Sequence, residues 1–385
     1  MKYILSIVIP TKNRSYYCLY AVKQILSLQL HDVEICIQDN SDTDDLSKEL
    51  SLLNAENIIY NYHPGILSFV DNFSEAVSLA HGDYLCMIGD DDGILPVIIN
   101  LVEDMKNQNA EAAIPALNFI YFWPSNQGII DKGDNGVLIS HLSSEYKLHS
   151  GKQVNNSKAV TELLKNGIQN YISFDMPRLY HGVVRKDALE KIKEKTGHYF
   201  GGLTPDMYMS TALSLVCNKV IRVNYSVTIS GICPSSGSSD SATGKHTGEL
   251  KQAPHFRGHD HYHWDDLVPT FYSVDTIWAD TLFHTLRDFH REDLFNYYNI
   301  SLFTGLCVKK YPEYSNTVLT YAYNRNCSDS SIKIELFKYK FEQLSLRVLR
   351  KIKRSLKSGI GKTTIKECNI GDIFAAQKRI MELKG

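Results

Sequence analysis

Three consecutive carboxylates, Asp90, Asp91 and Asp92, follow the apolar run at residues 84–88 after a single glycine, Gly89. Adjacent Asp side chains repel one another, and a buried strand offers nothing that offsets this cost. Oxygen ligands on a turn are what Mg²⁺ and Mn²⁺ prefer. The pattern therefore indicates a divalent-cation site at the end of a strand. Asp and Gly are also ordinary turn residues, so a solvated acidic turn is the alternative.

The elements that must position this turn alternate between strand and helix patterns. Strand-like apolar runs occupy residues 3–10, 33–38, 58–62 and 84–88, and apolar residues recur at helical spacing between them. Such alternation predicts an α/β fold with a mostly parallel sheet flanked by helices. Ligands bind outside the C-terminal ends of parallel strands. We therefore expect the loops at 11–14, 39–44 and 90–92 to meet at one edge of the sheet.

Composition places the chain among ordinary soluble globular proteins, with 43% hydrophobic and 22% charged residues over 385 positions. A net charge of -2 gives no reason to expect a nucleic-acid partner. We interpret residues 1–10 as a first strand rather than a signal peptide, and no apolar run reaches the roughly 18 residues of a membrane helix. The eight Cys are scattered, which suits buried thiols in a reducing cytosol. A cytoplasmic enzyme is expected.

Two boundaries divide the rest of the chain. Residues 1–230 are expected to form the first domain, in two halves at 1–117 and 118–230. Residues 231–263 lack large apolar residues over much of their length, which predicts a mobile lid or linker loop. Residues 264–385 show mainly helical spacing.

The Gly-rich dinucleotide fingerprint is absent from the first strand-to-helix turn, which disfavours NAD and FAD.

The motifs together resemble family 2 of the glycosyltransferases, enzymes with the Rossmann-like GT-A fold. The resemblance rests on four stretches in order, covers residues 3–105 well and fades beyond 230. They are Ser6-Ile7-Val8-Ile9-Pro10-Thr11-Lys12-Asn13-Arg14, Gln38-Asp39-Asn40-Ser41-Asp42-Thr43-Asp44, Asn72 with Ala76, Ala80, Gly82, Asp83 and Tyr84, and Asp90-Asp91-Asp92.

The resemblance implies that residues 1–230 form the catalytic domain, with a nucleotide-binding half (1–117) and an acceptor-side half (118–230). The first of these halves would contain a nucleotide-sugar pocket. Its residues would be Pro10, Thr11, Asn13, Arg14, Asp39, Asn40, Asn72 and Asp90. Asp39 would accept a hydrogen bond from the nucleobase ring N–H, and Asn72 would line the pocket. The family's metal motif is Asp-x-Asp, and this chain departs from it because Gly89 stands at the first Asp. Asp91 aligns with the second Asp, with Asp90 or Asp92 able to compensate.

Asp206, in Pro205-Asp206-Met207, stands where the family places the base that deprotonates the acceptor hydroxyl. A nearby helix N-terminus would keep it ionised at neutral pH. Without the resemblance, an ordinary first-turn carboxylate is the better interpretation of Asp206.

Two histidine positions are candidates of a weaker kind. His181 has Gly182 beside it, which permits close approach to a donor sugar, although a lone His is more often a core or surface residue. His259 lies in a stretch at 255–263 rich in metal-ligand types, and we consider it as a further metal ligand against the alternative of a polar surface loop.

Residues 333–357 combine basic side chains with apolar residues at helical spacing. A basic amphipathic helix is typical of a membrane-surface or partner-binding element. The alternative is a helix packed on the catalytic domain with a solvated basic face. Contact with the inner face of the plasma membrane would suit a polyprenyl-linked acceptor, for which anionic lipid contributes about 1 kcal/mol per basic residue.

The function expected from these observations is a metal-dependent, inverting glycosyltransferase that uses a nucleotide sugar, with a uridine diphosphate sugar favoured. The expected acceptor is a bacterial surface glycan such as O-antigen or capsule, or its polyprenyl-linked precursor. Two alternatives stay open: a sugar nucleotidyltransferase, which would release pyrophosphate, and a non-catalytic binding protein with a degenerate metal motif, suggested by Gly89. The sequence does not determine the sugar, the linkage or the oligomeric state.

Overall fold

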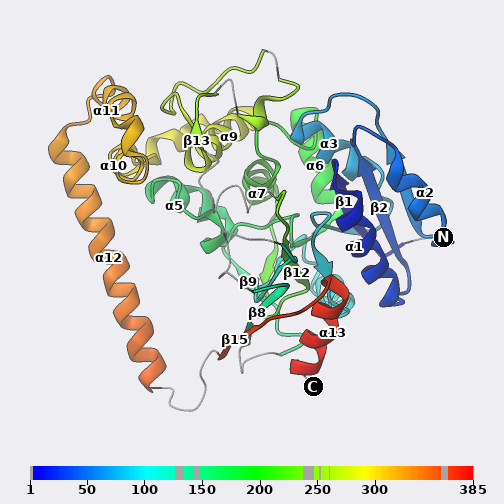
Figure 1. Cartoon of the computed structure of the whole chain (residues 1–385). Helices are drawn as coiled ribbons and strands as arrows, with labels where there is room; N and C mark the ends of the chain where they lie inside the picture. Colours follow the sequence, from blue (N-terminus) through cyan, green and yellow to red (C-terminus); the bar gives the residue numbers. More distant parts are fainter. Residues whose placement is uncertain are drawn as a thin grey trace.

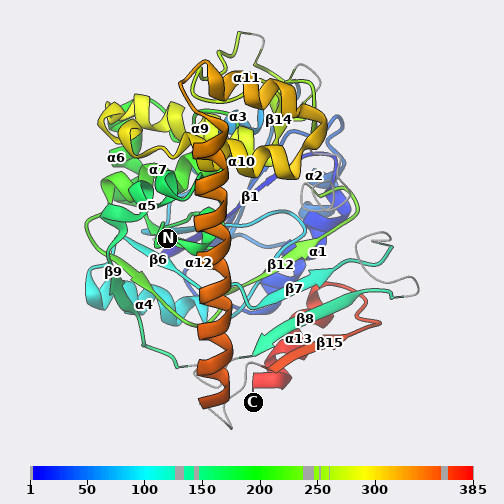
Figure 2. The same ribbon diagram turned by 90° about the vertical axis from the view of Figure 1, so that its left-hand side faces the viewer.

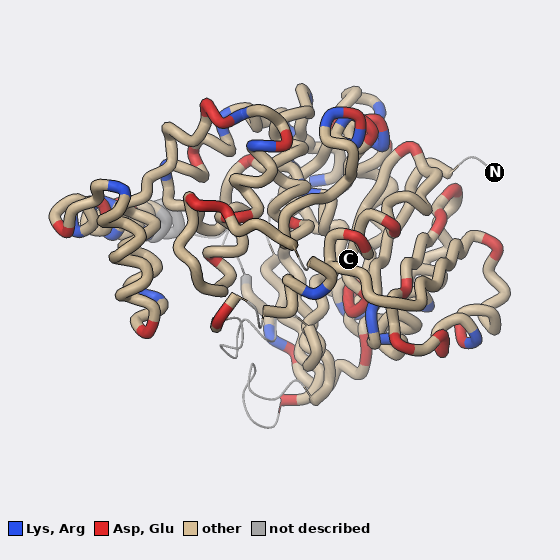
Figure 3. Tube along the Cα trace, turned by 90° about the horizontal axis from the view of Figure 1, so that it is seen from above, with Lys and Arg blue, Asp and Glu red and all other residues tan. Residues whose placement is uncertain are grey.

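The computed structural model describes residues 3–125, 134–142, 147–236, 247–250, 253–259, 261–356 and 363–384. A sheet lies at the centre of the N-terminal part, helices cover it on both sides, and a second, helical part carries the long helix α12 (Asp329–Leu356) at its outer side (Figure 1). Acidic and basic residues are interspersed along most of the trace, as the small net charge predicts (Figure 3).

The large sheet has eight strands in the order β3-β2-β1-β4-β10-β6-β11-β9. β1, β2, β3 and β4 are mutually parallel, and β10 and β9 run antiparallel to their neighbours. Their bounds are β1 (Leu5–Thr11), β2 (Val33–Asp39), β3 (Ile58–Tyr62), β4 (Tyr84–Met87), β6 (Ala112–Ile114), β9 (Lys152–Val154), β10 (Val183–Arg185) and β11 (Val220–Arg222). The predicted α/β class, with a mostly parallel sheet flanked by helices, is confirmed.

Successive side chains of β1 point to opposite faces of the sheet, so its apolar residues serve two cores. Ile7 and Ile9 pack with one group of helices, and Val8 packs with another. The first group is α1 (Ser15–Ser27), α2 (Asp45–Ser51), α4 (Ile98–Gln108) and α13 (Ile373–Lys384). The second is α3 (Phe69–Ser78), α6 (Lys186–Thr196) and α7 (Pro205–Val216). Burial on both faces explains why β1 and β2 are continuous apolar runs rather than alternating ones.

A second, five-stranded sheet has the order β15-β8-β7-β12-β5. Its strands are β5 (Gly93–Ile94), β7 (Phe119–Phe122), β8 (Val137–Leu142), β12 (Thr228–Ile232) and β15 (Thr363–Glu367). The chain leaves the first sheet after β11 and enters the second at β12. The apolar pattern continues through the crossing, so it carries no signal of the change of sheet.

The remaining elements are mainly helical and pack in a third core with two smaller clusters beside it. They are η1 (Asn156–Lys158), α5 (Ala159–Lys165), η2 (Tyr171–Ser173), β13 (Thr247–Gly248), η4 (Pro254–Phe256), β14 (Tyr272–Ser273), α9 (Val274–Asp288), η5 (Glu292–Tyr297), α10 (Ile300–Lys310), η6 (Pro312–Tyr314) and α11 (Ser315–Tyr323), followed by α12. The helical spacing predicted from residue 264 onward is present in α9 to α12. Within the described residues, no helix is both long and apolar enough to cross a bilayer.

The C-terminal segment returns from α12 to the first domain. β15 pairs with β8, and Ile373, Ala376 and Ile380 of α13 are fully buried in the core that also contains α1. Figure 2 shows α13 and β15 beside β8, far from the helices α10 and α11. Residues 363–384 therefore pack with the N-terminal domain, a position that a division at residue 264 does not anticipate.

Much of the predicted lid lies outside the described residues, namely 237–246, 251–252 and 260. Its described parts pack on the body of the protein. Arg257 donates to the Leu67 carbonyl at 2.9 Å, and His255 lies against Phe69 with ring centroids 5.0 Å apart.

Candidate functional site

The ends of β1, β2 and β4 meet at one edge of the large sheet. Thr11 is paired in register with Asp39, and Val8 with Met87, so the residues that follow these strands leave the sheet side by side. The carboxyl ends of parallel strands are where open α/β sheets bind ligands. The structure thus brings together the loops expected to form the site.

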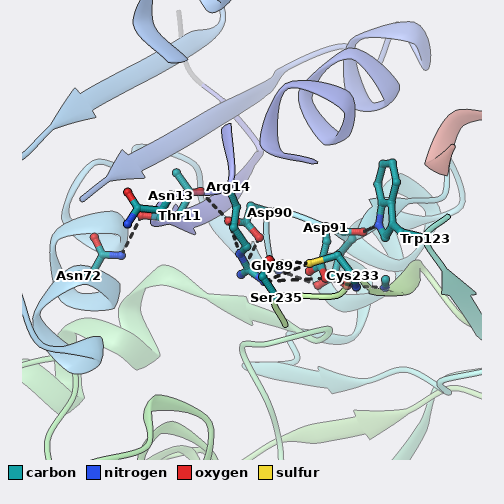
Figure 4. A network of polar contacts seen from close by, with 12 residues as sticks. Thr11, Asn13, Arg14, Asn72, Gly89, Asp90, Asp91, Trp123, Cys233 and Ser235 are labelled. Carbon is teal, nitrogen blue, oxygen red and sulfur yellow. Dashed lines mark hydrogen bonds and ion pairs between the residues drawn. The ribbon is translucent and has the colours of Figure 1, made fainter. Parts of the chain in front are cut away.

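Arg14 ties two of these loops together (Figure 4). Its Nη2 atom lies 2.6 Å from Asp90 Oδ1, its Nε donates to Asp90 Oδ2 at 3.0 Å, and its Nη1 is 3.9 Å from Asp91 Oδ2. Thr11 Oγ1 also donates to Asp90 Oδ2, at 2.5 Å. Burial acts to lower the pKa of Arg14, but the two carboxylates raise it overall. Arg14 therefore stays cationic and partly compensates the charge of the acidic turn.

The pKa of Asp90 is raised to about 6, chiefly by burial, while Arg14 and the Thr11 hydroxyl act to lower it. The Asp90 side chain is fully buried. Its bonds to Thr11 and Arg14 hold the first loop against the third, so Asp90 acts here as the link between them.

Asp92 is held by protein donors on both of its oxygens. The Gly231 amide donates to Oδ1 at 2.6 Å, and the Gly89 amide donates to Oδ2 at 2.6 Å. The Tyr180 hydroxyl donates to Oδ2 at 3.0 Å, and His181 Nε2 lies 3.4 Å from the same atom. This set of bonds fixes the acidic turn to β12 and to the segment before β10, which differs from the metal contact expected for Asp92.

Asp91 is the carboxylate with capacity to spare. The Cys233 amide donates to its Oδ2 at 3.0 Å, and Trp123 Nε1 donates to its backbone carbonyl at 2.9 Å. No donor to Asp91 Oδ1 is found in the described part of the chain. A hard divalent cation takes oxygen ligands and keeps several waters or phosphate oxygens, so one free carboxylate oxygen is a donor set that fits Mg²⁺ or Mn²⁺. Across the described ranges, no group of three His, Cys, Asp or Glu is placed to hold a metal by itself.

The departure at Gly89 has a structural explanation. A Cβ atom on Gly89 would lie 2.7 Å from Tyr180 Oη and 3.0 Å from Asp92 Oδ2. Tyr180 thus occupies the space that a side chain at position 89 would need. Gly89, where the resemblance places the first Asp of the metal motif, therefore leaves the space that the Tyr180 hydroxyl fills.

The expected nucleotide pocket is built mostly from bonds between the first two loops. Asn13, at φ 54°, donates from its amide to Ser41 Oγ at 2.7 Å. Asn40 Nδ2 donates to the carbonyls of His63 and Gly65 at 3.0 and 2.7 Å. Asn40 therefore shapes the rim of the site. Pro10, inside fully buried β1, only precedes this loop.

Asp39 and Asn72 differ in what they offer a ligand. Asp39 is fully buried, and its oxygens accept from the Ser41 amide at 2.8 Å and the Tyr60 hydroxyl at 3.0 Å. The structure does not present Asp39 to a nucleobase as expected. Asn72 Nδ2 donates to the Thr11 carbonyl at 3.3 Å, whereas its buried Oδ1 has no hydrogen-bond partner in the described structure. An unsatisfied buried acceptor costs free energy until a donor reaches it.

Asp206 is the second residue of α7, directly after Pro205, which suits a helix N-terminus. The Tyr171 hydroxyl donates to its Oδ2 at 3.1 Å. Burial raises the pKa of Asp206, against the lowering effect of the Met207 amide and Tyr171. A pKa moved toward neutrality suits a general base.

Asp206 and the acidic turn lie on two sides of the same tyrosine. A narrow pocket contains Asp206 and Tyr180 among its lining residues, which are Phe73, Met87, Tyr171, Arg178, Leu179, Tyr180, Phe200, Pro205, Asp206 and Met209. Because the hydroxyl of Tyr180 bonds to Asp92, this pocket adjoins the turn that carries Asp91.

The two histidines have different surroundings. His181 is 5% exposed, and its Nδ1 lies 2.9 Å from Thr228 Oγ1. Burial lowers its pKa to about 3, so the ring is neutral and supports the Asp92 loop. His259 packs against Tyr262, with ring centroids 5.6 Å apart, and no contact between His259 and the acidic turn is found in the described part of the chain. The close approach allowed by Gly182 is to a backbone carbonyl, because a Cβ there would lie 1.9 Å from the Arg178 oxygen.

Sequence reasoning missed the residues that hold the acidic turn from the far side. These are Trp123, Tyr180, Gly231 and Cys233. Only Gly231 had a local signal: glycine inside a strand pattern marks close backbone approach, and a Cβ there would lie 1.8 Å from the Asp91 carbonyl oxygen.

Comparisons with known proteins agree with this geometry. Residues 6–125 match the model of glycosyl transferase family 2. The chain is 32% identical over 113 residues to abequosyltransferase RfbV of Salmonella typhimurium, a match that spans 28% of this chain and about a third (34%) of that protein.

Among solved structures, S. aureus TarS 1-349 in complex with UDP-GlcNAc aligns with 86% of this chain and 93% of its own, at 10% identity and a TM-score of 0.44. A longer S. aureus TarS structure aligns with 83% of this chain and 55% of its own, at 12% identity and a TM-score of 0.46. The similarity to glycosyl transferase family 2 thus lies in residues 6–125, which contain Arg14 and the three carboxylates.

Proposed function

We propose that this protein is a glycosyltransferase that moves a sugar from a nucleoside diphosphate sugar, with uridine favoured as the nucleoside, to a hydroxyl of a glycan or lipid-linked glycan. The observation that carries the proposal is the adjacency of the Asp91 turn to the Asp206 pocket through Tyr180. Tyr180 therefore belongs to the pocket that contains Asp206 and also contacts the acidic turn through Asp92. The family domain and the relative named as an abequosyltransferase support sugar transfer.

On the donor side, the loop at 11–14 would contact the nucleotide. Asn72 Oδ1 is an acceptor that lacks a donor, and it lies next to the Thr11 carbonyl that Asn72 Nδ2 contacts. A ribose hydroxyl or a base N–H would satisfy it. Asp39 would support the rim by holding Ser41 and Tyr60 rather than by touching the base.

Asp91 would hold a divalent cation, Mg²⁺ or Mn²⁺, through Oδ1. When bound, such a cation supplies positive charge beside the departing diphosphate, an effect worth several kcal/mol. Arg14 lies between Asp90 and Asp91, so its positive charge mainly compensates these two carboxylates. Stabilising the charge of the diphosphate would therefore fall to the divalent cation.

Asp206 would act as the general base. It takes the acceptor proton while the acceptor oxygen forms a bond to the anomeric carbon and the bond from that carbon to the diphosphate oxygen breaks. One displacement of this kind inverts the configuration at the anomeric carbon. General-base catalysis contributes about 100- to 10,000-fold to such rates.

The experiment is a donor panel with a surface-glycan acceptor, measured by release of nucleoside diphosphate. Asp206→Asn should lower kcat by about 100-fold or more while the Kd for the donor stays within about twofold. Asp187→Asn is the matched control, because Asp187 is the second residue of α6 as Asp206 is of α7, and it is exposed. Equal loss of donor binding in Asp206→Asn would show that the base is misplaced.

The same assay distinguishes the alternatives. Pyrophosphate formed from a nucleoside triphosphate would identify a nucleotidyltransferase. A rise in melting temperature with a nucleotide sugar, without release of any nucleotide, would identify a binding protein. Either result overturns the transferase proposal.

A further inference from the structure

The outer part of α12 carries a ridge of exposed apolar side chains. We define the ridge by Ile334, Phe337, Phe341, Leu344 and Val348, which are 53%, 71%, 64%, 58% and 47% exposed. Their spacing alternates between three and four residues, which places all five on one side of a helix. Large apolar side chains this exposed and this contiguous mark a contact surface rather than chance.

The ridge points away from the rest of the protein. The opposite side of α12 packs on α10: Ile332 is 6% exposed, Ser301 donates to Ser331 at 3.0 Å, and Asn299 donates to Glu335 at 2.9 Å. At about 100° per residue these positions lie roughly half a turn from the ridge. A Cβ on Gly305 would lie 2.5 Å from Leu336 Cγ, so the two helices are closely packed and the ridge is held in place.

Among the described elements, none stands in front of the ridge-bearing helix. In Figure 1 α12 is the outermost element on its side, and in Figure 2, where that side faces the viewer, it crosses in front of the other elements. The apolar surface is therefore convex and accessible to a broad, flat partner.

Charge decides which partner fits. Lys333, Lys340 and Arg347 are exposed and fall seven residues apart along one flank of the ridge, and Lys338 lies on the other flank. The acidic residues of this stretch, Glu335 and Glu342, lie toward the Lys338 side of the helix, where Glu335 pairs with Lys338 at 2.6 Å, so the uncompensated basic flank is that of Lys333, Lys340 and Arg347. Apolar side chains bordered by basic ones are the pattern of helices that lie in the interface of an anionic membrane.

A second copy of the chain fits less well. A parallel pairing of two ridges would set Lys333 against Lys338 of the other copy, and an antiparallel pairing would set each basic flank against itself. Like charges at these flanking positions oppose coiled-coil pairing. The ridge also spans only about two heptads, fewer than a stable coiled coil needs.

We propose that the ridge of α12 seats the protein on an anionic lipid surface, with the apolar side chains between the headgroups and the flanking cations near lipid phosphates. Basic residues near such a surface each strengthen binding about fivefold. This contact needs neither donor nor acceptor, so it stands independently of the transferase assignment.

The test is co-sedimentation of the full chain with vesicles of phosphatidylcholine alone and with added phosphatidylglycerol in a roughly two-to-one ratio. The wild type should bind only the anionic vesicles. Two variants should each weaken binding about tenfold or more: the ridge variant Phe337→Ser/Phe341→Ser and the flank variant Lys333→Glu/Lys340→Glu/Arg347→Glu. Because the flank residues are exposed, that variant tests the proposal even if the ridge variant unfolds.

The matched control is Lys23→Glu/Lys48→Glu/Lys195→Glu, which makes the same charge change at exposed positions of α1, α2 and α6. It should bind within about twofold of the wild type. Equal loss in the control would mean that binding follows net charge alone and overturns the proposal. Absence of wild-type binding to anionic vesicles would also overturn it, as would a dimer or a complex with an acidic protein that the ridge variant dissociates while vesicle binding persists.

Discussion

Two groups of buried carboxylates in this protein have similar electrostatics and different chemistry. The sheet-edge carboxylates are Asp90, Asp91 and Asp92; the helical-region pair is Asp265 and Asp280, which are 2% and 0% exposed. Burial raises the pKa of Asp90 to about 6, and it raises the pKa of Asp280 to about 6 as well. A raised pKa in a buried carboxylate therefore does not by itself identify a site.

The difference lies in what remains unpaired. Asp280 accepts from the Tyr262 hydroxyl at 2.5 Å and from the Asp265 amide at 2.8 Å. Asp265 accepts from Arg287 at 2.8 Å and from the Leu267 amide at 2.9 Å. Every oxygen of the pair has a donor, whereas Asp91 Oδ1 has none in the described structure. An oxygen without a donor is available to a ligand, whereas the oxygens of the helical-region pair are already used by the protein's own donors.

The contrast between the two groups of carboxylates requires that Asp91 Oδ1 binds a ligand. We expect Asp91→Asn to lower kcat/KM by about 100-fold or more and to abolish metal-dependent donor binding, because the neutral amide cannot hold the cation. Asp32→Asn is the control, since Asp32 is exposed, precedes β2 at the opposite edge, and its φ of 55° suits Asn. Full activity of Asp91→Asn, or of the wild type in excess chelator, would remove the metal from the mechanism.

The structural role of the helical-region pair predicts the reverse outcome. Asp280→Ala should lower the free energy of unfolding by about 3 kcal/mol, because it leaves the Tyr262 hydroxyl and the Asp265 amide without an acceptor. The kcat of the folded fraction should not change. Urea unfolding measures the first, and turnover corrected for active protein measures the second. Asp266→Ala, an exposed neighbour, should be neutral, and a loss of kcat in Asp280→Ala would break the comparison.

A double-mutant cycle tests the tight packing around the sheet-edge carboxylates. Gly89→Ala should lower kcat/KM about tenfold, because the new Cβ would lie 2.7 Å from Tyr180 Oη. Tyr180→Phe removes that atom, so activity of the double variant should exceed the product of the single effects. Additive losses would show that Tyr180 does not fill the position of the missing Asp.

The smallest effect concerns pH. Tyr171 stabilises the ionised form of Asp206, so Tyr171→Phe should raise the pKa of Asp206 further. At a given acidic pH more of the base is then protonated, and the acid limb of the kcat/KM profile should move to higher pH. Tyr262→Phe removes the equivalent bond to Asp280 and should leave that limb in place. A shift in both variants would show that the acid limb of the kcat/KM profile does not report the protonation of Asp206.

Local pattern determined a large part of the fold. β1 to β4 and the helices between them follow from apolar periodicity, and Pro205 before Asp206 announces the start of α7. These signals are local because strand and helix periods and helix-start residues act over a few positions. The return of α13 to the core beside α1 had no such signal, since a distant partner leaves no local mark.

Local patterns alone predict that three carboxylates follow a buried strand and that an acid lies in the first turn of α7. Which carboxylate oxygen stays without a donor depends on the folded chain, because the donors come from distant segments. They are Arg14 from the first loop, Tyr180 before β10, and the backbone amides of Gly231 in β12 and of Cys233 after it. A residue's type fixes how many hydrogen bonds it can accept, but its neighbours in space decide how many are already made.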